Sequence, residues 1–363
     1  MFSKTLLGAS VIAAVTAIPE NEKFTSLPGF DKDMPSDSYS GYLTATDSKK
    51  LHYIFVESQG DKDADPILIW LNGGPGCSSL LGFFTEHGPF LTDGTTFEEN
   101  EHAWNKRANV LYIESPAGVG FSTTSDTEWD TNDTLSAEDL YAAVADWFSK
   151  FDSFAQGKEL YISGESYGGV YVPYLAYEVY KNNNIYTVQG NDDKIINLKG
   201  FLVGNGATHW DYDVSPSYPQ TLYGFNMISK QLFDEFNDQG CEYYFNDFRT
   251  HKGPDTCDDL WEQINAAAED MWWYDMYRPD PQGKLPTEVE REGKVTVGGQ
   301  EKTYKRGYTP RELTPWLAKM NPKNKHLDRV MDVSLSDYIN QEDTRSALHI
   351  PNDVQSWAAC SEQ

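Results

Sequence analysis

Short apolar runs alternate with longer amphipathic segments through the N-terminal part of the chain. The runs Tyr39–Ala45 and Leu51–Glu57 are separated by a polar turn, and this arrangement predicts a β-hairpin. The later runs are apolar almost throughout, which is typical of parallel strands that are buried on both faces. These strands are expected at residues 66–71, 108–114, 159–162 and 198–203.

Helical periodicity appears between these apolar runs. Apolar residues recur at helical spacing from Leu140 to Phe151, after Ser136–Asp139, which resembles a capping box with Asp in place of Glu. A second segment with roughly helical spacing runs from Val170 to Tyr180. Strands that alternate with helices predict an α/β fold, with a mostly parallel sheet and flanking helices on both faces.

The alternation ends at about residue 207. The stretch 207–320 is too long for a simple connection between strands, so we expect a partly helical cap inserted over the sheet. Trp272 and Trp273 could line a substrate cleft there, although core packing explains them equally well. The charged residues Glu288–Tyr304 predict a flexible stretch.

The N-terminus reads as a targeting segment. Met1–Ala17 has a positive residue, an apolar stretch and small residues before a cut, which predicts a signal peptide followed by a domain at 18–363. No later run approaches the 18 apolar residues of a membrane span. The net charge of −27 argues against nucleic acid and anionic membrane surfaces as partners. We therefore expect a protein of the secretory pathway.

An oxidising compartment makes the four cysteines candidates for disulfides. Three pairings are possible, and pairing Cys241 with Cys257 closes a local loop and leaves Cys77 with Cys360. No Cys or His spacing suggests a metal site, and no cofactor is expected. Asn132 begins the only N-glycosylation sequon.

The strongest chemical signal is Gly164-x-Ser166-x-Gly168, which follows a predicted strand and precedes a predicted helix. This is the pattern of a nucleophile elbow, a sharp turn that exposes a serine hydroxyl above the end of a sheet. The alternative is a glycine-rich turn in an unrelated parallel sheet.

A second glycine-rich loop follows the strand at 66–71 and runs from Asn72 to Ser79. Its bare backbone amides could present N–H groups to an oxyanion. A phosphate-binding loop is the alternative, but the lysine that such a loop requires is missing.

Three stretches together resemble the serine carboxypeptidase family (peptidase family S10), whose members have the α/β-hydrolase fold. They are residues 70–79, 114–122 and 164–169, and the likeness runs from about Tyr39 to the end of the chain. The resemblance implies that Ser166 is the nucleophile and that Cys77 pairs with Cys360. It also implies an oxyanion hole and a site for the C-terminal carboxylate of a peptide. The oxyanion donors would be the amides of Gly74 and Tyr167, and the carboxylate site would contain Asn72, Gly73, Glu165 and Glu86, with Glu86 hydrogen-bonded to Glu165.

Paired glutamates make chemical sense beside a carboxylate substrate. If Glu86 and Glu165 share protons, one pKa rises and the pair donates hydrogen bonds instead of repelling the ligand. This predicts an acidic optimum for peptide binding.

A serine nucleophile also needs a base, and an acid that orients the base. In the family the Asp and His of the triad lie well beyond the Trp-x-x-Cys-Ser segment, whereas this chain stops at Gln363, three residues after Cys360. The histidines after Ser166 lack a strand-end setting; they are His209, His251, His326 and His349. We therefore expect an incomplete domain in which the last strands of the sheet are absent, with little hydrolysis by this chain alone.

The resemblance implies a glycoprotein hydrolase, secreted or delivered to a lysosome or vacuole, that releases C-terminal residues from peptides and proteins with a free C-terminus. Two alternatives remain: an acyltransferase on the same scaffold, and a non-catalytic binding or stabilising paralogue. The oligomeric state is left open.

Overall fold

The computed structural model describes ten stretches of the chain: residues 18–126, 131–210, 212–213, 216–241, 256–268, 271–272, 275–279, 292–297, 300–305 and 333–361. The predicted signal peptide, Trp273 and part of Glu288–Tyr304 lie outside them. The chain divides into two compact units, Met1–Gly206 with Val330–Gln363, and Ala207–Arg329. The two units are described separately below.

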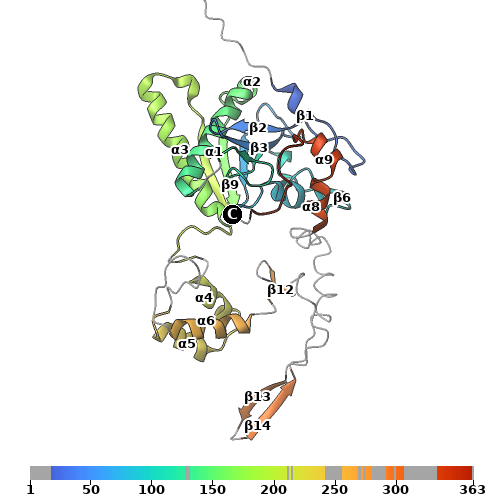
Figure 1. Cartoon of the computed structure of the whole chain (residues 1–363). Helices are drawn as coiled ribbons and strands as arrows, with labels where there is room; N and C mark the ends of the chain where they lie inside the picture. Colours follow the sequence, from blue (N-terminus) through green and yellow to red (C-terminus); the bar gives the residue numbers. More distant parts are fainter. Residues whose placement is uncertain are drawn as a thin grey trace, which may run out of the picture. The chain divides into compact units, whose positions relative to one another are not determined.

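The first unit is built on one eight-stranded sheet with the order β1-β2-β3-β7-β4-β9-β10, where β8 pairs with β3 (Figure 1). β7, β4, β9 and β10 run parallel to one another, while β1, β2 and β3 are antiparallel neighbours and β3 meets β7 antiparallel. The predicted hairpin and strands at the four predicted positions are all present. However, β10 is not buried: it ends the described strand order, and Phe201 is 54% and Leu202 51% exposed. The strands are β1 (Lys23–Phe24), β2 (Ser38–Thr44), β3 (Lys49–Val56), β4 (Ile67–Leu71), β7 (Asn109–Ile113), β8 (Thr123–Thr124), β9 (Leu160–Glu165) and β10 (Leu198–Gly204).

Alternate residues of the central strands pack into two separate cores. Phe55 in β3 belongs to one core with Trp147 of α1 (Asp133–Lys150). Its neighbour Ile54 belongs to the other core with Tyr338 of α8 (Val333–Ile339). Figure 1 shows α1 and α3 (Gly168–Gln189) at one side of the sheet, and α8 and α9 (Glu342–Ala347) at the other. The central strands are therefore covered on both faces, as their apolar sequences require.

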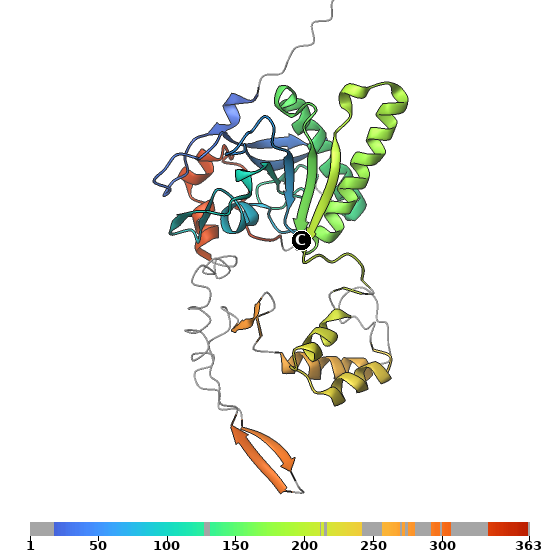
Figure 2. The ribbon, with the colours of Figure 1, turned by 180° about the vertical axis from the view of Figure 1, so that it is seen from behind.

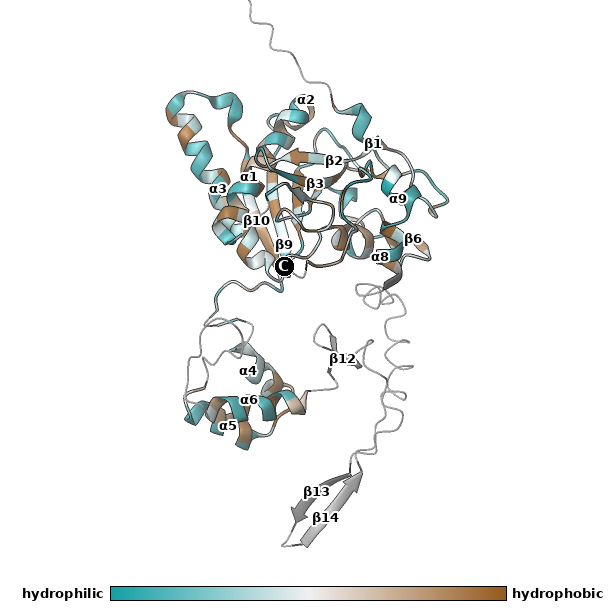
Figure 3. Cartoon of the chain, in the orientation of Figure 1, coloured by the Kyte–Doolittle hydropathy of each residue, from teal (hydrophilic) through white to brown (hydrophobic). Residues whose placement is uncertain are grey.

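Helix α3 (Gly168–Gln189) follows β9 directly and lies beside β10 (Figure 2). Hydrophobic and hydrophilic residues alternate along it (Figure 3). Leu175 and Val179 are buried, whereas Tyr177 and Tyr180 are exposed. One face of the helix is thus buried, as expected for a helix that packs on a sheet.

The start of α1 differs from the prediction. Asn132 is the N-cap, and its side chain accepts a hydrogen bond from the Leu135 amide at 3.0 Å. Ser136, the first residue of the predicted capping box, lies inside the helix. Asn is as good an N-cap as Ser, so the earlier polar residue starts the helix.

Short elements complete the first unit. They are the two-stranded sheet of β5 (Phe90–Thr92) and β6 (Phe97–Glu99), helix α2 (Asp152–Ala155), the 3₁₀ turns η1 (Glu20–Glu22), η3 (Trp104–Lys106) and η4 (Asp192–Lys194), and the π-helical turn η2 (Gly82–Glu86).

In its described residues, the second unit has three helices packed on their own core, and a disulfide joins Cys241 to Cys257. The predicted cap is thus partly helical, while its position over the sheet stays a prediction. The described part of Glu288–Tyr304 pairs as a hairpin, and its flexibility stays a prediction. The elements are α4 (Ser217–Gly224), α5 (Lys230–Asp238), α6 (Thr256–Ala267), β11 (Met271–Trp272), β12 (Asp275–Pro279), β13 (Glu292–Val297) and β14 (Gln300–Lys305).

Among the helices of the described stretches, none is long and apolar enough to cross a membrane.

Candidate active site

Ser166 occupies a sharp turn between β9 and α3. Its φ angle is +56°, in the left-handed region that side chains rarely adopt, and the residue is exposed. Its amide donates to the Gly204 carbonyl of the neighbouring strand at 3.1 Å. A serine held in a strained conformation above a strand end is the geometry of a nucleophile elbow.

The glycine before the elbow is required by close packing. A Cβ on Gly164 would lie 2.6 Å from the Leu71 carbonyl oxygen and 2.9 Å from Val172 Cγ2. Real side chains do not approach this closely, so only glycine lets β9 and α3 pack on the end of β4.

The loop Asn72–Ser79 lies directly against this elbow. A Cβ on Gly73 would lie 2.4 Å from the Tyr167 amide nitrogen and 2.8 Å from Ser166 Cβ. Gly74 has a φ of +113°, and within the described residues its amide meets no hydrogen-bond acceptor. The structure therefore brings the predicted nucleophile and the two predicted amide-bearing residues, Gly74 and Tyr167, to one place.

Asn72 presents its amide group in one fixed orientation. Its Oδ1 accepts from Trp70 Nε1 at 2.7 Å and from the Gly82 amide at 3.0 Å. Because both donors need the oxygen, Nδ2 must face the other way. There it donates to Glu165 Oε1 at 2.9 Å and to Glu86 Oε1 at 3.1 Å.

Glu86 and Glu165 are linked through Asn72 and not by the direct hydrogen bond that we expected. We expected a direct hydrogen bond between Glu86 and Glu165, but in the described contacts both carboxyl groups accept from the Asn72 amide instead. The Asn72 Nδ2 group has two N–H donors, and it uses one for each carboxyl.

Burial changes the acidity of this pair. Desolvation, followed by the nearby Glu165 charge, raises the pKa of Glu86 to about 8, against a weaker lowering by the Asn72 hydrogen bond. Desolvation also raises the pKa of Glu165. At neutral pH the site therefore contains a protonated carboxyl that can donate a hydrogen bond to an anion.

Among the described residues of the first unit, no histidine hydrogen-bonds to the Ser166 hydroxyl, so we assign none of them as its base. His349 Nδ1 lies 3.3 Å from the Ser40 carbonyl oxygen, which is a structural contact. His209 belongs to the second unit, and His251 and His326 lie outside the described residues.

The cysteine pairing is confirmed. Cys77 pairs with Cys360 and Cys241 with Cys257, which leaves no free cysteine in the described part. Beside the first disulfide, the Ser78 amide donates to the Ala359 carbonyl and the Ser361 amide to the Gly76 carbonyl, both at 2.8 Å. The C-terminal segment is thus fastened to the loop Asn72–Ser79 on both sides of the bridge.

Two further predicted residues, Asn132 and Tyr167, lie at the starts of helices α1 and α3. Asn132 is exposed at the N-cap of α1, and its role as a glycosylation site stays a prediction. Tyr167 donates its hydroxyl hydrogen to Asp133 Oδ1 at 2.9 Å, which ties the elbow to the start of α1. Within the described residues, no cluster of three or more potential ligands could hold a metal ion.

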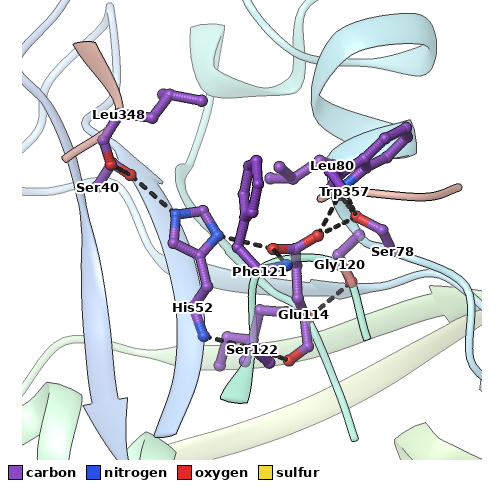
Figure 4. Close-up of polar contacts among 12 residues, drawn as sticks. Ser40, His52, Ser78, Leu80, Glu114, Gly120, Phe121, Ser122, Leu348 and Trp357 are labelled. Atoms are coloured by element: carbon purple, nitrogen blue, oxygen red, sulfur yellow. Dashed lines mark hydrogen bonds and ion pairs between the residues drawn. The ribbon is translucent and has the colours of Figure 1, made fainter. Parts of the chain in front are cut away.

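Reasoning from the sequence missed several residues that shape the site. Trp70 orients Asn72, and a buried network of His52, Glu114 and Trp357 lies behind the loop (Figure 4). Glu114 is separated by 62 residues from His52 and by 243 from Trp357. No local pattern could have joined positions so far apart.

Comparisons with known proteins agree with this geometry. A family model described as serine carboxypeptidase matches residues 28–363. The lysosomal protective protein of Mus musculus is 37% identical over 350 residues, covering 95% of this chain and 71% of that protein. Serine carboxypeptidase-like 21 of Arabidopsis thaliana is 42% identical over 225 residues, covering 60% of this chain and 44% of its own length.

A solved structure extends the likeness to the fold. The structure of KEX1(DELTA)P, a prohormone-processing carboxypeptidase from Saccharomyces cerevisiae, superposes with a TM-score of 0.65 at 19% identity. The match covers 94% of this chain and 71% of that one. With the mostly parallel sheet and the elbow, this likeness shows the α/β-hydrolase fold.

Proposed function

This chain belongs to the serine carboxypeptidase family, and on that basis we propose a serine-type carboxypeptidase that releases C-terminal residues from peptides through an acyl-enzyme on Ser166. The observation that carries the proposal is the Asn72 amide between two glutamates, one of which directly precedes the elbow serine. A hydrolase that ignored chain ends would have no use for such a group.

The proposed chemistry follows from the positions of these groups. Ser166 Oγ attacks the carbonyl carbon of the last peptide bond, and the amides of Gly74 and Tyr167 stabilise the oxyanion. The C–N bond then breaks, the terminal amino acid leaves with the proton, and water hydrolyses the acyl-enzyme. Ser166 must pass its proton to a base for fast acylation, and we assign no described residue to that role.

The carboxylate site gives the proposal its pH dependence. Below about pH 8, Glu86 is protonated and can donate a hydrogen bond to the substrate carboxylate, while the Asn72 amide holds the two glutamates in place. At higher pH the ionised pair repels the same ligand. Peptide binding is therefore strongest at acidic pH and weakens as pH rises through 8.

The alternatives predict different properties. An acyltransferase uses the same serine but has no need for a carboxylate site, so the Glu86–Glu165 pair favours the peptidase. A non-catalytic paralogue would keep the binding site without a reactive serine. Two disulfides support a place in the secretory pathway, in a lysosome, in a vacuole or outside the cell.

Two measurements test the proposal. The first compares binding of a short apolar peptide with that of its C-terminal amide between pH 5 and 9. We expect only the free acid to bind, and binding should weaken across this range. The second measures labelling of Ser166 by a fluorophosphonate, with Ser166→Ala as the control.

The combination of peptide binding and Ser166 labelling distinguishes the peptidase from the non-catalytic paralogue. Selective binding with fast labelling supports the peptidase, and selective binding without labelling supports the non-catalytic paralogue. Equal binding of the acid and the amide would overturn the carboxylate site.

A further inference from the structure

Glu114 lies at the centre of a buried polar network that meets the loop Asn72–Ser79 at Ser78 (Figure 4). It follows β7 and is fully buried, as are His52 and Ser78. Oε2 accepts from His52 Nδ1 at 2.8 Å and from the Phe121 amide at 3.0 Å. Oε1 accepts from Ser78 Oγ and from Trp357 Nε1, the latter at 2.9 Å. One carboxyl group thus joins four separate parts of the chain.

Ser40, His52 and Glu114 form a serine–histidine–acid array, but its hydrogen bonds are those of a structural network and not of an activated nucleophile. Ser40 Oγ donates its only proton to the Leu348 carbonyl at 2.7 Å, so His52 Nε2–H must donate to Ser40 at 3.0 Å. Ser40 has no proton left to transfer and is fully buried. On the other side of the ring, His52 Nδ1 lies 2.8 Å from Glu114 Oε2, so His52 links Ser40 to the carboxyl group.

Ser78 connects the network to the loop. Leu348 and Trp357 connect it to the C-terminal segment (Leu348–Ser361). The Cys77–Cys360 disulfide then joins the loop to the same segment. Gln355 also binds the Gly120 and Ser122 carbonyls, both at 2.8 Å. The loop and the C-terminal segment are thus joined covalently by the disulfide and, through the Glu114 carboxyl group, by hydrogen bonds from Ser78 and Trp357.

The glycine at 120 is consistent with a tightly filled network. Its φ is +53°, and a Cβ there would overlap the Glu114 carboxyl group. The backbone of this turn thus closes over Glu114 and excludes any larger residue.

We infer that Glu114, held in place by His52, is a positioning residue that clamps the loop Asn72–Ser79 to the C-terminal segment and so sets the Gly74 amide opposite Ser166. The inference rests on the proposed function for its catalytic consequence, because the Gly74 amide is the proposed oxyanion donor. Asn72 is fixed separately by Trp70 and Gly82. Loosening the clamp should therefore slow reaction at Ser166 and leave carboxylate binding nearly unchanged.

The test is Glu114→Gln, which keeps the shape of the side chain but replaces one acceptor oxygen with an N–H₂ donor. We expect faster hydrogen exchange of the amides in residues 73–79 and 348–361, by roughly tenfold or more. Labelling of Ser166 by a fluorophosphonate should slow by roughly 10- to 100-fold, since small misplacements have effects of this size. The dissociation constant of the peptide acid should change less than about twofold.

Glu57→Gln is the matched control. Glu57 is also buried and pairs with Lys62 at 2.6 Å, but it has no contact with this network. It should lower the melting temperature without a selective change in loop exchange or labelling. If Glu114→Gln does not fold, Trp357→Phe removes one donor and keeps the aromatic packing, and it should give the same changes on a smaller scale.

The outcomes separate the two proposals. Normal loop exchange in Glu114→Gln, or equal effects of the two glutamate variants, would overturn the clamp. If the wild-type chain neither labels nor binds peptide, the proposed function fails, while the exchange comparison still decides whether the clamp exists.

Discussion

Replacing Glu86 with Gln should remove a large part of the pH dependence of stability. The pKa of Glu86 rises from 4.5 to about 8 in the folded chain, mainly because of desolvation and secondly because of Glu165. Below pH 4.5 the carboxyl is protonated in both the folded and the unfolded chain. Between pH 4.5 and 8 only the unfolded chain releases the proton, so the free energy of unfolding falls as pH rises.

The size of the effect follows from the same values. At about 1.4 kcal/mol per tenfold change in proton affinity, a rise from 4.5 to about 8 corresponds to roughly 5 kcal/mol. This is a large share of the 5–15 kcal/mol that is typical of a folded domain. The glutamine variant cannot ionise and does not lose this stability at high pH.

Urea unfolding followed by tryptophan fluorescence measures the effect from pH 4 to 9. The difference in unfolding free energy between Glu86→Gln and wild type should be small and constant below pH 4.5, grow through neutrality and level off above pH 8. Titrating groups that do not interact with Glu86 cancel in this difference. Glu165→Gln removes the second cause of the raised pKa, so in that variant the loss of stability due to Glu86 should still begin near pH 4.5 but level off below pH 8. A difference that stays constant across the whole range would refute a protonated Glu86.

Three further changes have expected outcomes. Gly73→Ala places a Cβ 2.4 Å from the Tyr167 amide nitrogen, so the loop Asn72–Ser79 must move away from the elbow. Fluorophosphonate labelling of Ser166 should then slow by at least roughly tenfold, with little change in the helical circular dichroism. Replacing both residues of the Cys77–Cys360 disulfide opens a loop with a sequence separation of 283 residues, which should lower the unfolding free energy by roughly 5 kcal/mol in the chain-entropy model; an unchanged urea midpoint would contradict this. Trp70→Phe removes a donor to Asn72 Oδ1, which should weaken peptide-acid binding about fivefold in calorimetry, as expected for one hydrogen bond of about 1 kcal/mol.

The parts of the fold that follow from local rules could be predicted from the sequence. Buried strands such as β4 are apolar throughout, and the glycines around Ser166 stand at the fixed spacing of a strand–turn–helix elbow, although the nearest atom to a Cβ on Gly164, the Leu71 carbonyl oxygen, is distant in the sequence. Both features leave a mark in the sequence. The start of α1 was misplaced because Asn132 and Ser136 are both good caps, and only the folded chain decides between them.

The polar contacts of the site depend on the assembled fold. Asn72 could be identified by resemblance, but the orientation of its amide is set by Trp70 and Gly82. The link between His52 and Glu114 arises because β3 and β7 are neighbours in the sheet. A sequence contains the residues of such a network without showing which of them meet.

The order of residues at the end of β9 bears on the length of the fragment released. Glu165, which binds Asn72, is followed directly by Ser166, so their Cα atoms are about 3.8 Å apart. A substrate carboxylate held at Glu165 and a carbonyl attacked by Ser166 must therefore be close together along the substrate. The two groups of a peptide that meet this condition are its terminal carboxylate and the carbonyl of its last peptide bond. The proposed enzyme should thus release single residues, and amidated or extended ends should lose the anchor that aligns the bond with the serine.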